Sequence, residues 1–195
     1  MVLSFRQNFR IPKTTSVGAR LPLLLGMILR APTSSDLSAL AELGRATFVE
    51  TFGDLYRPED LESFLISVYS EKAIAEELES ESLHYQVLEH ENRLIGYAKI
   101  GPVHVPVENP ASDAMELWQL YVLKEFIGQG HGSKLMTWAN EQFTQRKASE
   151  VYVSVFSENS RAIRFYENQS FTKVGEYGFP VGDHIDLEWI MRREA

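Results

Sequence analysis

The sequence predicts an α/β fold, in which a mixed and mostly antiparallel β-sheet is flanked by helices. Three observations lead to this prediction. The chain has 195 residues, which is the length of one domain. Segments with apolar residues at helical spacing alternate with short segments rich in β-branched and aromatic residues. A polar turn joins two strands in the first half, whereas a strand–helix–strand unit occupies the second half.

The first third of the domain is predicted to be helical after one short strand, Met27–Arg30. Residues 31–36 form a turn that starts a helix, and apolar residues at helical spacing continue to Phe48. Pro58 opens a second helix, because proline is tolerated at a first helical position. Glu71–Glu79 is predicted as a third, short helix. A solvated acidic face is expected at Glu76, Glu77, Glu79 and Glu81.

Strands and two further helices are predicted for the remainder. The strands are His84–Glu89, Leu94–Ile100, Met115–Leu123, Val151–Phe156, Phe171–Tyr177 and Ile185–Met191. The turn Glu91-Asn92-Arg93 joins the first two as a hairpin, and residues 101–113, with three prolines, are predicted as a loop. Helices are predicted at Ser133–Arg146 and Asn159–Gln169.

Composition excludes several classes of function. The formal net charge is −8, from 19 basic and 27 acidic residues, which disfavours a nucleic-acid partner because such binding needs a basic face. The chain has no cysteine, so disulfides, thiolate metal sites and cysteine nucleophiles are excluded. No histidine spacing typical of a metal site occurs, and we expect no metal. The lack of cysteine fits a reducing compartment, and we expect a cytoplasmic protein.

Residues 1–26 are predicted to be a flexible N-terminal extension that precedes a domain at residues 27–195. The first 30 residues contain five basic residues and no acid. The apolar run at residues 21–29 is too short to span a membrane and is interrupted by Pro22 and Gly26. A targeting peptide is the alternative, but no small-residue cleavage pattern follows this run. Met27, where the domain pattern begins, is a natural alternative start.

A glycine-rich turn carries the first functional signal. The strand that ends Leu120-Tyr121-Val122 is followed by Gly128-Gln129-Gly130-His131-Gly132-Ser133 and then by a helix. Closely spaced glycines let the backbone approach a ligand, and the helix presents unpaired N–H groups, so the turn can hold a diphosphate. A tight structural turn is the alternative. The Walker and dinucleotide-binding patterns fit less well in spacing and position.

A second motif follows one strand later, Asn159-Ser160-Arg161-Ala162-Ile163-Arg164-Phe165-Tyr166 with Phe171 after it. With both motifs at this separation, the chain resembles the GCN5-related N-acetyltransferase (GNAT) superfamily in element order over residues 27–192, most strongly over 115–178. The resemblance implies a sheet splayed around the strand Met115–Leu123, with acetyl-CoA as co-substrate. Residues 47–53 and 181–184 resemble the branch that includes polyamine acetyltransferases.

The resemblance implies specific contacts with acetyl-CoA. The backbone of Leu120, Tyr121 and Val122 is expected to pair with the pantetheine arm. The N–H groups of the turn are expected to hold the diphosphate; its residues are Gly128, Gln129, Gly130, His131, Gly132 and Ser133. Asn159 is expected to cap its helix and to touch the cofactor. Ile127 departs from the family pattern, which has Arg or Gln there, so we expect weaker affinity, with Gln129 as a partial substitute.

Two residues are expected to move protons. Tyr166 occupies the family position that protonates the departing CoA thiolate, although a tyrosine at helical spacing is also typical of a core residue. Glu116, beside apolar Leu117, is a candidate base for the acceptor amine. An ordinary strand-start carboxylate and a water chain are the alternatives. Asp183 and His184 are candidates either for the acceptor end or for a surface turn.

The resulting hypothesis is direct transfer of an acetyl group from acetyl-CoA to a small-molecule amine. The acidic balance of the chain favours a polyamine-like acceptor. A CoA-binding module without turnover, acetylation of a protein amine and an interaction or toxin-like role remain alternatives. No membrane partner is expected, and a homodimer is compatible with the sequence.

Overall fold

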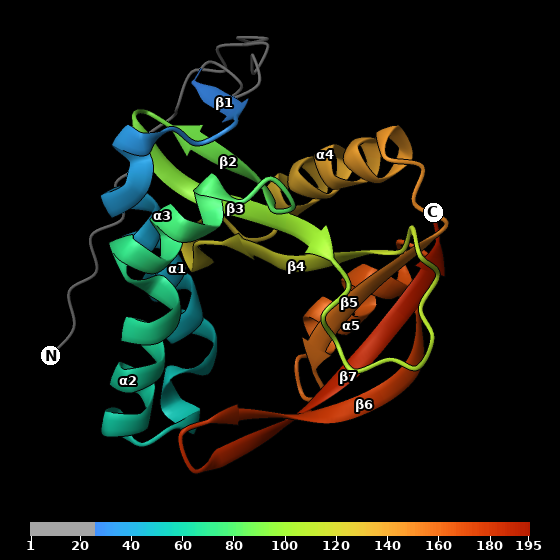
Figure 1. The fold of residues 1–195 in the computed structure, drawn as a ribbon. Coiled ribbons are helices and arrows are strands. Elements are labelled where there is room, and N and C mark those ends of the chain that lie inside the picture. Colours follow the sequence, from blue (N-terminus) through green and yellow to red (C-terminus); the bar gives the residue numbers. More distant parts are fainter. Residues whose placement is uncertain (1–25) are drawn as a thin grey trace, which may run out of the picture.

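A seven-stranded sheet in the order β1-β2-β3-β4-β5-β7-β6 organises residues 26–195, which are the residues that the computed structural model describes (Figure 1). All but residue 26 of the predicted N-terminal extension lies outside the described residues. The strands are β1 (Met27–Arg30), β2 (His84–His90), β3 (Arg93–Pro102), β4 (Met115–Val122), β5 (Glu150–Phe156), β6 (Thr172–Val181) and β7 (His184–Glu194). Every pair is antiparallel except β4–β5, so the predicted fold class is confirmed.

Helices cover both faces of this sheet. They are α1 (Leu37–Phe52), α2 (Pro58–Tyr69), α3 (Glu71–Glu79), α4 (His131–Gln145) and α5 (Ser160–Glu167), with short 3₁₀ turns at Ser34–Asp36, Gly53–Leu55 and Lys124–Phe126. Helices α1 and α4 both pack on β3 and β4, and α2 and α3 pack on α1. In Figure 1, α1–α3 stand on one side of the central strands and α4 lies on the other.

Local chemistry explains two of the element boundaries that differ from the predicted ones. The β2–β3 hairpin turns on Glu91 and Asn92, whose φ angles are +50° and +64°, as a two-residue type I′ turn requires. Arg93 is therefore in β3 rather than in the turn. Helix α4 begins at His131 instead of Ser133, because the left-handed Gly130 ends the turn directly before it.

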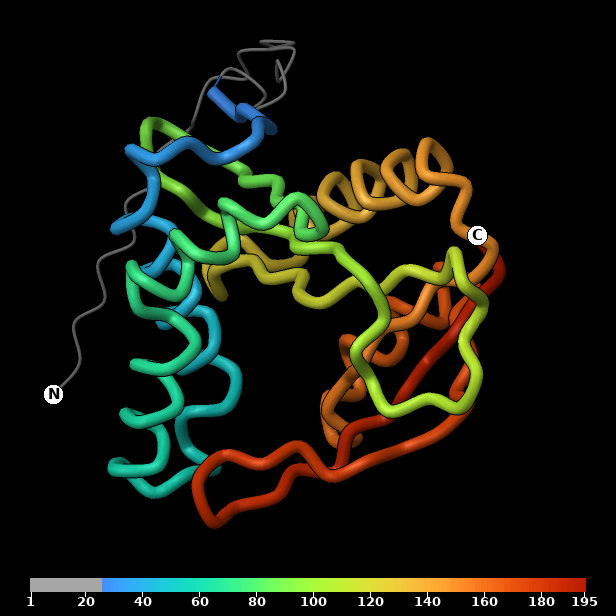
Figure 2. The backbone as a smooth tube through the Cα atoms, in the orientation of Figure 1, coloured from blue at the N-terminus to red at the C-terminus, as the bar shows by residue number. Residues whose placement is uncertain are grey.

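The last hairpin is longer than its sequence predicts. Strand β6 continues through Gly178 and Pro180 to Val181, although glycine and proline are poor strand formers. It is an edge strand, so Pro180 removes no hydrogen bond from the interior of the sheet. The extended β6–β7 hairpin reaches across to α2 (Figure 2).

The central feature of the fold is the divergence of β4 and β5. These parallel strands pair only from Met115–Leu117 to Val151–Val153, and beyond this point their backbones separate (Figure 2). On its other edge, β4 stays paired with β3, except that the register shifts and leaves Trp118 as a β-bulge. The strand therefore has one unpaired edge from Trp118 to Val122 among the described strands.

Two apolar clusters hold the walls of this opening in place. The main core lies between the sheet and α1 and α4; its least exposed members include Val87, Ile95, Leu117, Leu135 and Phe143. A second cluster joins α1, α2 and the tip of β6 through Phe48, Phe52, Tyr56, Leu65, Tyr69 and Val181. The helices are thus fixed to the far end of the last hairpin, across the opening.

Gly44 on α1 gives a direct test of this packing. A Cβ at Gly44 would lie 2.5 Å from the ring of Tyr69, which is 2% exposed and accepts a hydrogen bond from Gln119. Overpacking costs about 1–3 kcal/mol and alanine gains about 1 kcal/mol in helix propensity. We therefore expect Gly44→Ala to lower the unfolding free energy by up to about 2 kcal/mol, measured by urea denaturation. Glu42→Ala, at an exposed position of α1, should change it by less than about 0.5 kcal/mol.

Candidate active site

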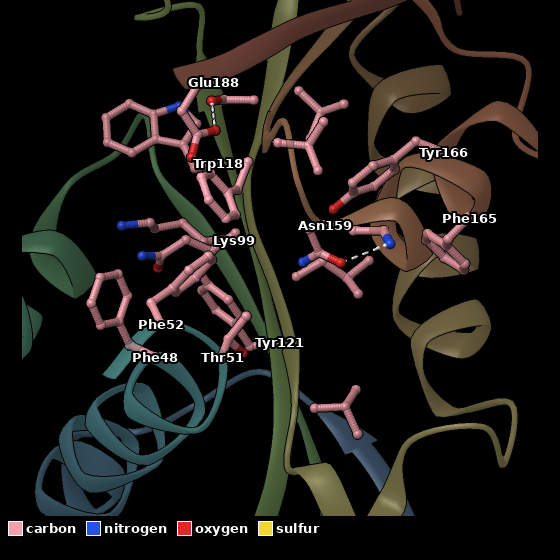
Figure 3. Close-up of a pocket in the computed structure, with 18 of the residues that line it drawn as sticks. Phe48, Thr51, Phe52, Lys99, Trp118, Tyr121, Asn159, Phe165, Tyr166 and Glu188 are labelled. Atoms are coloured by element: carbon pink, nitrogen blue, oxygen red, sulfur yellow. Dashed lines mark hydrogen bonds between the residues drawn. The ribbon is translucent and has the colours of Figure 1, made fainter. Parts of the chain in front are cut away.

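A cavity of about 710 Å³ lies where β4 and β5 part. Figure 3 shows β4 passing between two groups of side chains. Tyr166, Phe165 and Asn159 lie on the side of α5, and the opposite side holds Lys99, Trp118, Glu188 and the aromatic residues of α1. The cavity thus has two chambers that communicate past one strand.

The glycine-rich turn closes the α4 end of the cavity. Gly128 and Gly130 both have φ of +84°, a conformation in which residues with a Cβ are strained. The turn leads directly into α4, whose first N–H groups have no acceptor within the helix. Gly128, Gly130, Gly132 and Ser133 line the cavity. The geometry therefore fits the predicted diphosphate site.

Two residues predicted for this turn direct their side chains elsewhere. The amide of Gln129 donates to the carbonyl oxygen of Glu125 at 2.9 Å, so it braces the turn. The ring of His131 is 6% exposed and packs near Phe126, with no hydrogen-bond partner for either ring nitrogen among the described residues. Burial lowers the pKa of His131, which favours a neutral ring.

Arg161 contacts the glycine-rich turn from α5, and no role was predicted for it from the sequence. It lies on α5, lines the cavity, and its Nη2 would be 3.7 Å from a Cβ on Gly128. It therefore brings a positive charge to the turn, next to the position where Ile127 lacks one. The only sequence signal was its place in the Asn159 motif.

The unpaired edge of β4 connects the turn to the centre of the cavity. Leu120, Tyr121 and Val122 line the cavity, and none pairs with β5. Unsatisfied backbone groups in a partly buried strand are costly, so this edge suits a ligand that carries amides of its own. The three predicted residues thus line the cavity with one backbone edge free, and their pairing with a pantetheine arm stays a prediction.

Tyr166 and Asn159 both line the cavity from α5 and its first turn. Tyr166 is 7% exposed and packs edge-on against Phe165 and Phe171, and its hydroxyl points toward β4 (Figure 3). Burial, with a smaller effect of Glu188, raises the pKa of Tyr166, so the phenol stays protonated. Asn159 caps the helix by accepting the Ala162 N–H at 3.0 Å.

Carboxylates line the opposite chamber. Glu188 on β7 accepts a hydrogen bond from Ser154, and burial raises the pKa of Glu188. Asp186, which is 3% exposed, is bonded to the hydroxyl of Tyr56 and to His184 Nε2. Asp183 is exposed and pairs with Arg57. Of the candidates at residues 183 and 184, neither lines the cavity directly; Asp186 does.

Glu116 lines the cavity and is 1% exposed. Its carboxylate accepts the backbone N–H groups of His104 at 2.7 Å and Val105 at 3.1 Å. It also lies 2.9 Å from His104 Nδ1. The predicted base is therefore enclosed by the loop that follows β3.

A partly buried ion pair completes this chamber. Lys99 Nζ lies 2.9 Å from Glu77 and 5.0 Å from the centre of the Trp118 ring, and its side chain is 4% exposed. Burial lowers the pKa of Lys99, against the opposing effect of Glu77. The expectation of a solvated face was wrong for Glu77, whose side chain turns inward, whereas Glu76, Glu79 and Glu81 are exposed.

Residues 26–195 contain no group of three or more histidine, aspartate or glutamate side chains placed to hold a metal ion. In the same part of the chain, none of the helices is both long and apolar enough to traverse a bilayer.

Comparison with known proteins identifies the kind of site. The model of the acetyltransferase (GNAT) family matches residues 47–171, which is more than half of the chain. An uncharacterized N-acetyltransferase of Lactobacillus delbrueckii subsp. lactis is 24% identical over 170 residues, covering 87% of this chain and 98% of the relative. A spermidine N(1)-acetyltransferase of Thermoplasma acidophilum is 22% identical over 170 residues, covering 85% of this chain and 96% of the relative.

Solved structures show the same fold. The PaiA N-acetyltransferase of Thermoplasma acidophilum, solved with coenzyme A, superposes with a TM-score of 0.71 at 21% identity, covering 87% of this chain and 99% of that one. YncA of Salmonella typhimurium, solved with acetyl-CoA, gives a TM-score of 0.59 at 19% identity, covering 87% of this chain and 94% of that one.

Arg161 provides the test of the diphosphate site. A hydrogen bond to a charged group contributes about 1.5–3 kcal/mol, and less where it is exposed. We expect Arg161→Ala to weaken acetyl-CoA binding about 5–10-fold, measured by isothermal titration calorimetry. Arg164→Ala is the matched control, because Arg164 is exposed on the same helix and does not line the cavity. Equal affinities for the two variants would contradict the assignment.

Proposed function

The chain belongs to the acetyltransferase (GNAT) family and is an acetyl-CoA-dependent N-acetyltransferase; from this premise we propose that its acceptor is a small-molecule amine of the polyamine class. The observation that carries the proposal is the composition of the chamber opposite α5. Four carboxylates, those of Glu77, Glu116, Asp186 and Glu188, line it with one lysine, Lys99.

This chamber suits a cation. The carboxylates produce a negative potential in a partly enclosed space, which raises the local concentration of ammonium groups. The aromatic ring of Tyr56 adds cation–π attraction, whereas the Trp118 ring already carries the Lys99 ammonium and the His104 imidazole. A bound ammonium would also favour the ionised form of Glu188, whose pKa burial raises.

The relatives support the polyamine class. The Thermoplasma relative is named for spermidine, and a probable spermine N(1)-acetyltransferase of Bacillus subtilis subsp. natto is 28% identical over 93 residues, covering 47% of this chain and 61% of the relative. We carry this acceptor class over to the present chain as part of the proposal.

Acetyl-CoA, as co-substrate, would enter from the side of α4 and α5. The N–H groups of Gly128–Ser133 and the Arg161 guanidinium would hold its diphosphate. The free edge of Leu120–Val122 would pair with the amides of its pantetheine arm. This path leads the thioester to the point where β4 and β5 separate, beside the Tyr166 hydroxyl.

Transfer would proceed by direct attack. The nitrogen lone pair of the neutral amine forms a bond to the thioester carbon, and a backbone N–H at Leu120–Val122 stabilises the resulting oxyanion. The C–S bond then breaks, and Tyr166 gives its proton to the departing sulfur. The amide nitrogen returns a proton to the Tyr166 oxygen, which leaves an N-acetyl product and CoA thiol.

Removal of the Tyr166 hydroxyl tests turnover against mere cofactor binding. We expect Tyr166→Phe to lower kcat by about 10²–10³-fold, since a positioned proton donor contributes on that scale. Acetyl-CoA should still raise the melting temperature of the variant as it does that of the wild type. The rate is measured by thiol release with spermidine as acceptor.

Tyr152→Phe is the control, because Tyr152 is bonded to Glu150 and lies outside the cavity. A wild-type protein that binds acetyl-CoA but acetylates no amine would instead support a binding module without turnover.

Neutralising Glu188 tests whether the chamber opposite α5 binds the acceptor. Glu188→Gln retains an acceptor for the Ser154 hydroxyl but removes the charge. We expect the KM for spermidine to rise about 5–10-fold, with little change in the KM for acetyl-CoA. Glu158→Gln, at an exposed position outside the cavity, should leave both constants unchanged. Better turnover of a lysine-containing peptide than of any polyamine would overturn the small-molecule proposal.

A further inference from the structure

The side chain of His104 stands at the acceptor chamber with a carboxylate behind it. It belongs to the loop between β3 and β4, lines the cavity, and its side chain is 52% exposed. Its ring stacks on Trp118 with centroids 4.2 Å apart and an interplanar angle of 28°. The sequence predicts that the loop at residues 101–113 walls the acceptor site, but it gives no signal for His104 itself.

Glu116 fixes the orientation of this ring. The carboxylate lies 2.9–3.0 Å from His104 Nδ1 and also accepts the backbone N–H of His104 itself. A buried carboxylate is a hydrogen-bond acceptor, so it selects the tautomer with the proton on Nδ1. The lone pair of Nε2 is then available, and Nε2 has no hydrogen-bond partner among residues 26–195.

The same contacts argue against direct proton transfer to Glu116. Its side chain is 1% exposed, and N–H groups of His104 and Val105 already occupy it. An amine in the chamber would have to displace these donors to reach the carboxylate. The exposed imidazole can be reached without rearrangement.

We propose that His104 is the base that takes the proton from the acceptor ammonium, and that Glu116 is a positioning residue that acts through it. The inference rests on the proposed amine acetyltransferase function. The N–H bond of the ammonium breaks, its electron pair stays on nitrogen, and the proton forms a bond to Nε2. Glu116 stabilises the imidazolium, which later releases the proton to solvent.

The position of the pair along β4 suits this role. His104 stacks on the bulged residue Trp118, and Trp118 precedes Leu120 by two residues, about 7 Å along a strand. An amine deprotonated at Nε2 of His104, beside Trp118, therefore needs only a short movement toward the oxyanion position.

Two other charged or titratable groups face His104 and Glu116. Lys99 of β3 lies over the Trp118 indole, and the charge of Glu116 contributes to the raised pKa of Tyr177 on β6.

The first experiment reads the tautomer without using activity. In ¹⁵N-detected NMR of the histidine rings of the full chain at pH 8, we expect His104 to carry its proton on Nδ1, with an unprotonated Nε2. In Glu116→Gln the two tautomers should mix. A His104 ring protonated on Nε2 in the wild type would overturn the proposal, whatever the enzyme acetylates.

The second experiment is a pH profile of kcat/KM with spermidine. His104→Phe keeps an aromatic ring over Trp118 but cannot take a proton. We expect its kcat/KM at pH 7 to fall about 10²–10³-fold, with recovery toward the wild-type rate near pH 10, where a substantial fraction of the amine is neutral in solution. Acetyl-CoA binding should be unchanged.

His84→Phe is the matched control, since His84 lies on β2 outside the cavity. A purely structural His104 would lower the rate equally at all pH values, and this outcome contradicts the proposal. If His104→Phe is unfolded, His104→Gln, which can still donate to Glu116, decides the question by the same profile. Failure of the wild type to acetylate amines at any pH would reject the proposed function. The NMR result would still show whether Glu116 sets the tautomer of His104.

Discussion

The site depends on the loss of the β5 partner by β4 after Leu117. A strand in the middle of a sheet normally satisfies its backbone on both edges, and β4 does so for only three residues toward β5. The bulge at Trp118, a feature that increases local twist, lies at the point where the pairing of β4 with β5 ends. One edge of backbone donors and acceptors then faces a cavity instead of a strand, so a ligand with amides can complete the sheet.

Because the sheet opens, distant segments must hold its halves at a fixed separation. The helices α1 and α2 contact the tip of the β6–β7 hairpin through the cluster that contains Phe48 and Val181. The hydrogen bond from Tyr56 to Asp186 spans 130 positions of the chain and is buried. Arg57 adds an exposed pair with Asp183, which contributes little on its own. The acceptor chamber is therefore a product of tertiary contacts rather than of any one element.

This division explains what the sequence could predict. The glycine turn and the Asn159 cap are local features, in which the residue sequence largely determines backbone conformation, and the structure places both at the cavity. Helix α3 has the predicted bounds for the same reason. The free end of β4 depends on sheet pairing, and it was expected only from the family resemblance. The β6 strand was underestimated because its edge position, which makes Pro180 acceptable, is a property of the whole sheet.

Side chains whose meaning depends on partners far along the chain could not be assigned in this way. In the sequence, Glu77 is one of several acids on a helix predicted to be solvated. In the structure, Lys99, 22 positions away on a strand, donates a hydrogen bond to it. Arg161 was one residue of a motif, and only the fold brings it to the turn at Gly128. Charge patterns along a helix show which residues are charged but not which of them are enclosed, and that is decided by the packing of other elements.

The partly buried pair of Lys99 and Glu77 also makes the electrostatic potential differ between the two sides of the acceptor chamber. Removing two charges from water is costly, and this cost is offset only where attraction and hydrogen bonds are good, as with the 2.9 Å contact here. The pair is nearly neutral as a whole, but its ammonium lies over the Trp118 ring inside the chamber. A polyamine bound with its reacting amine beside His104 would therefore have its other ammonium groups repelled from the β3 side and attracted toward Asp186 and Glu188 on β7. With acids on one side and the Lys99 ammonium on the other, the chamber would orient such an acceptor as well as attract its charge.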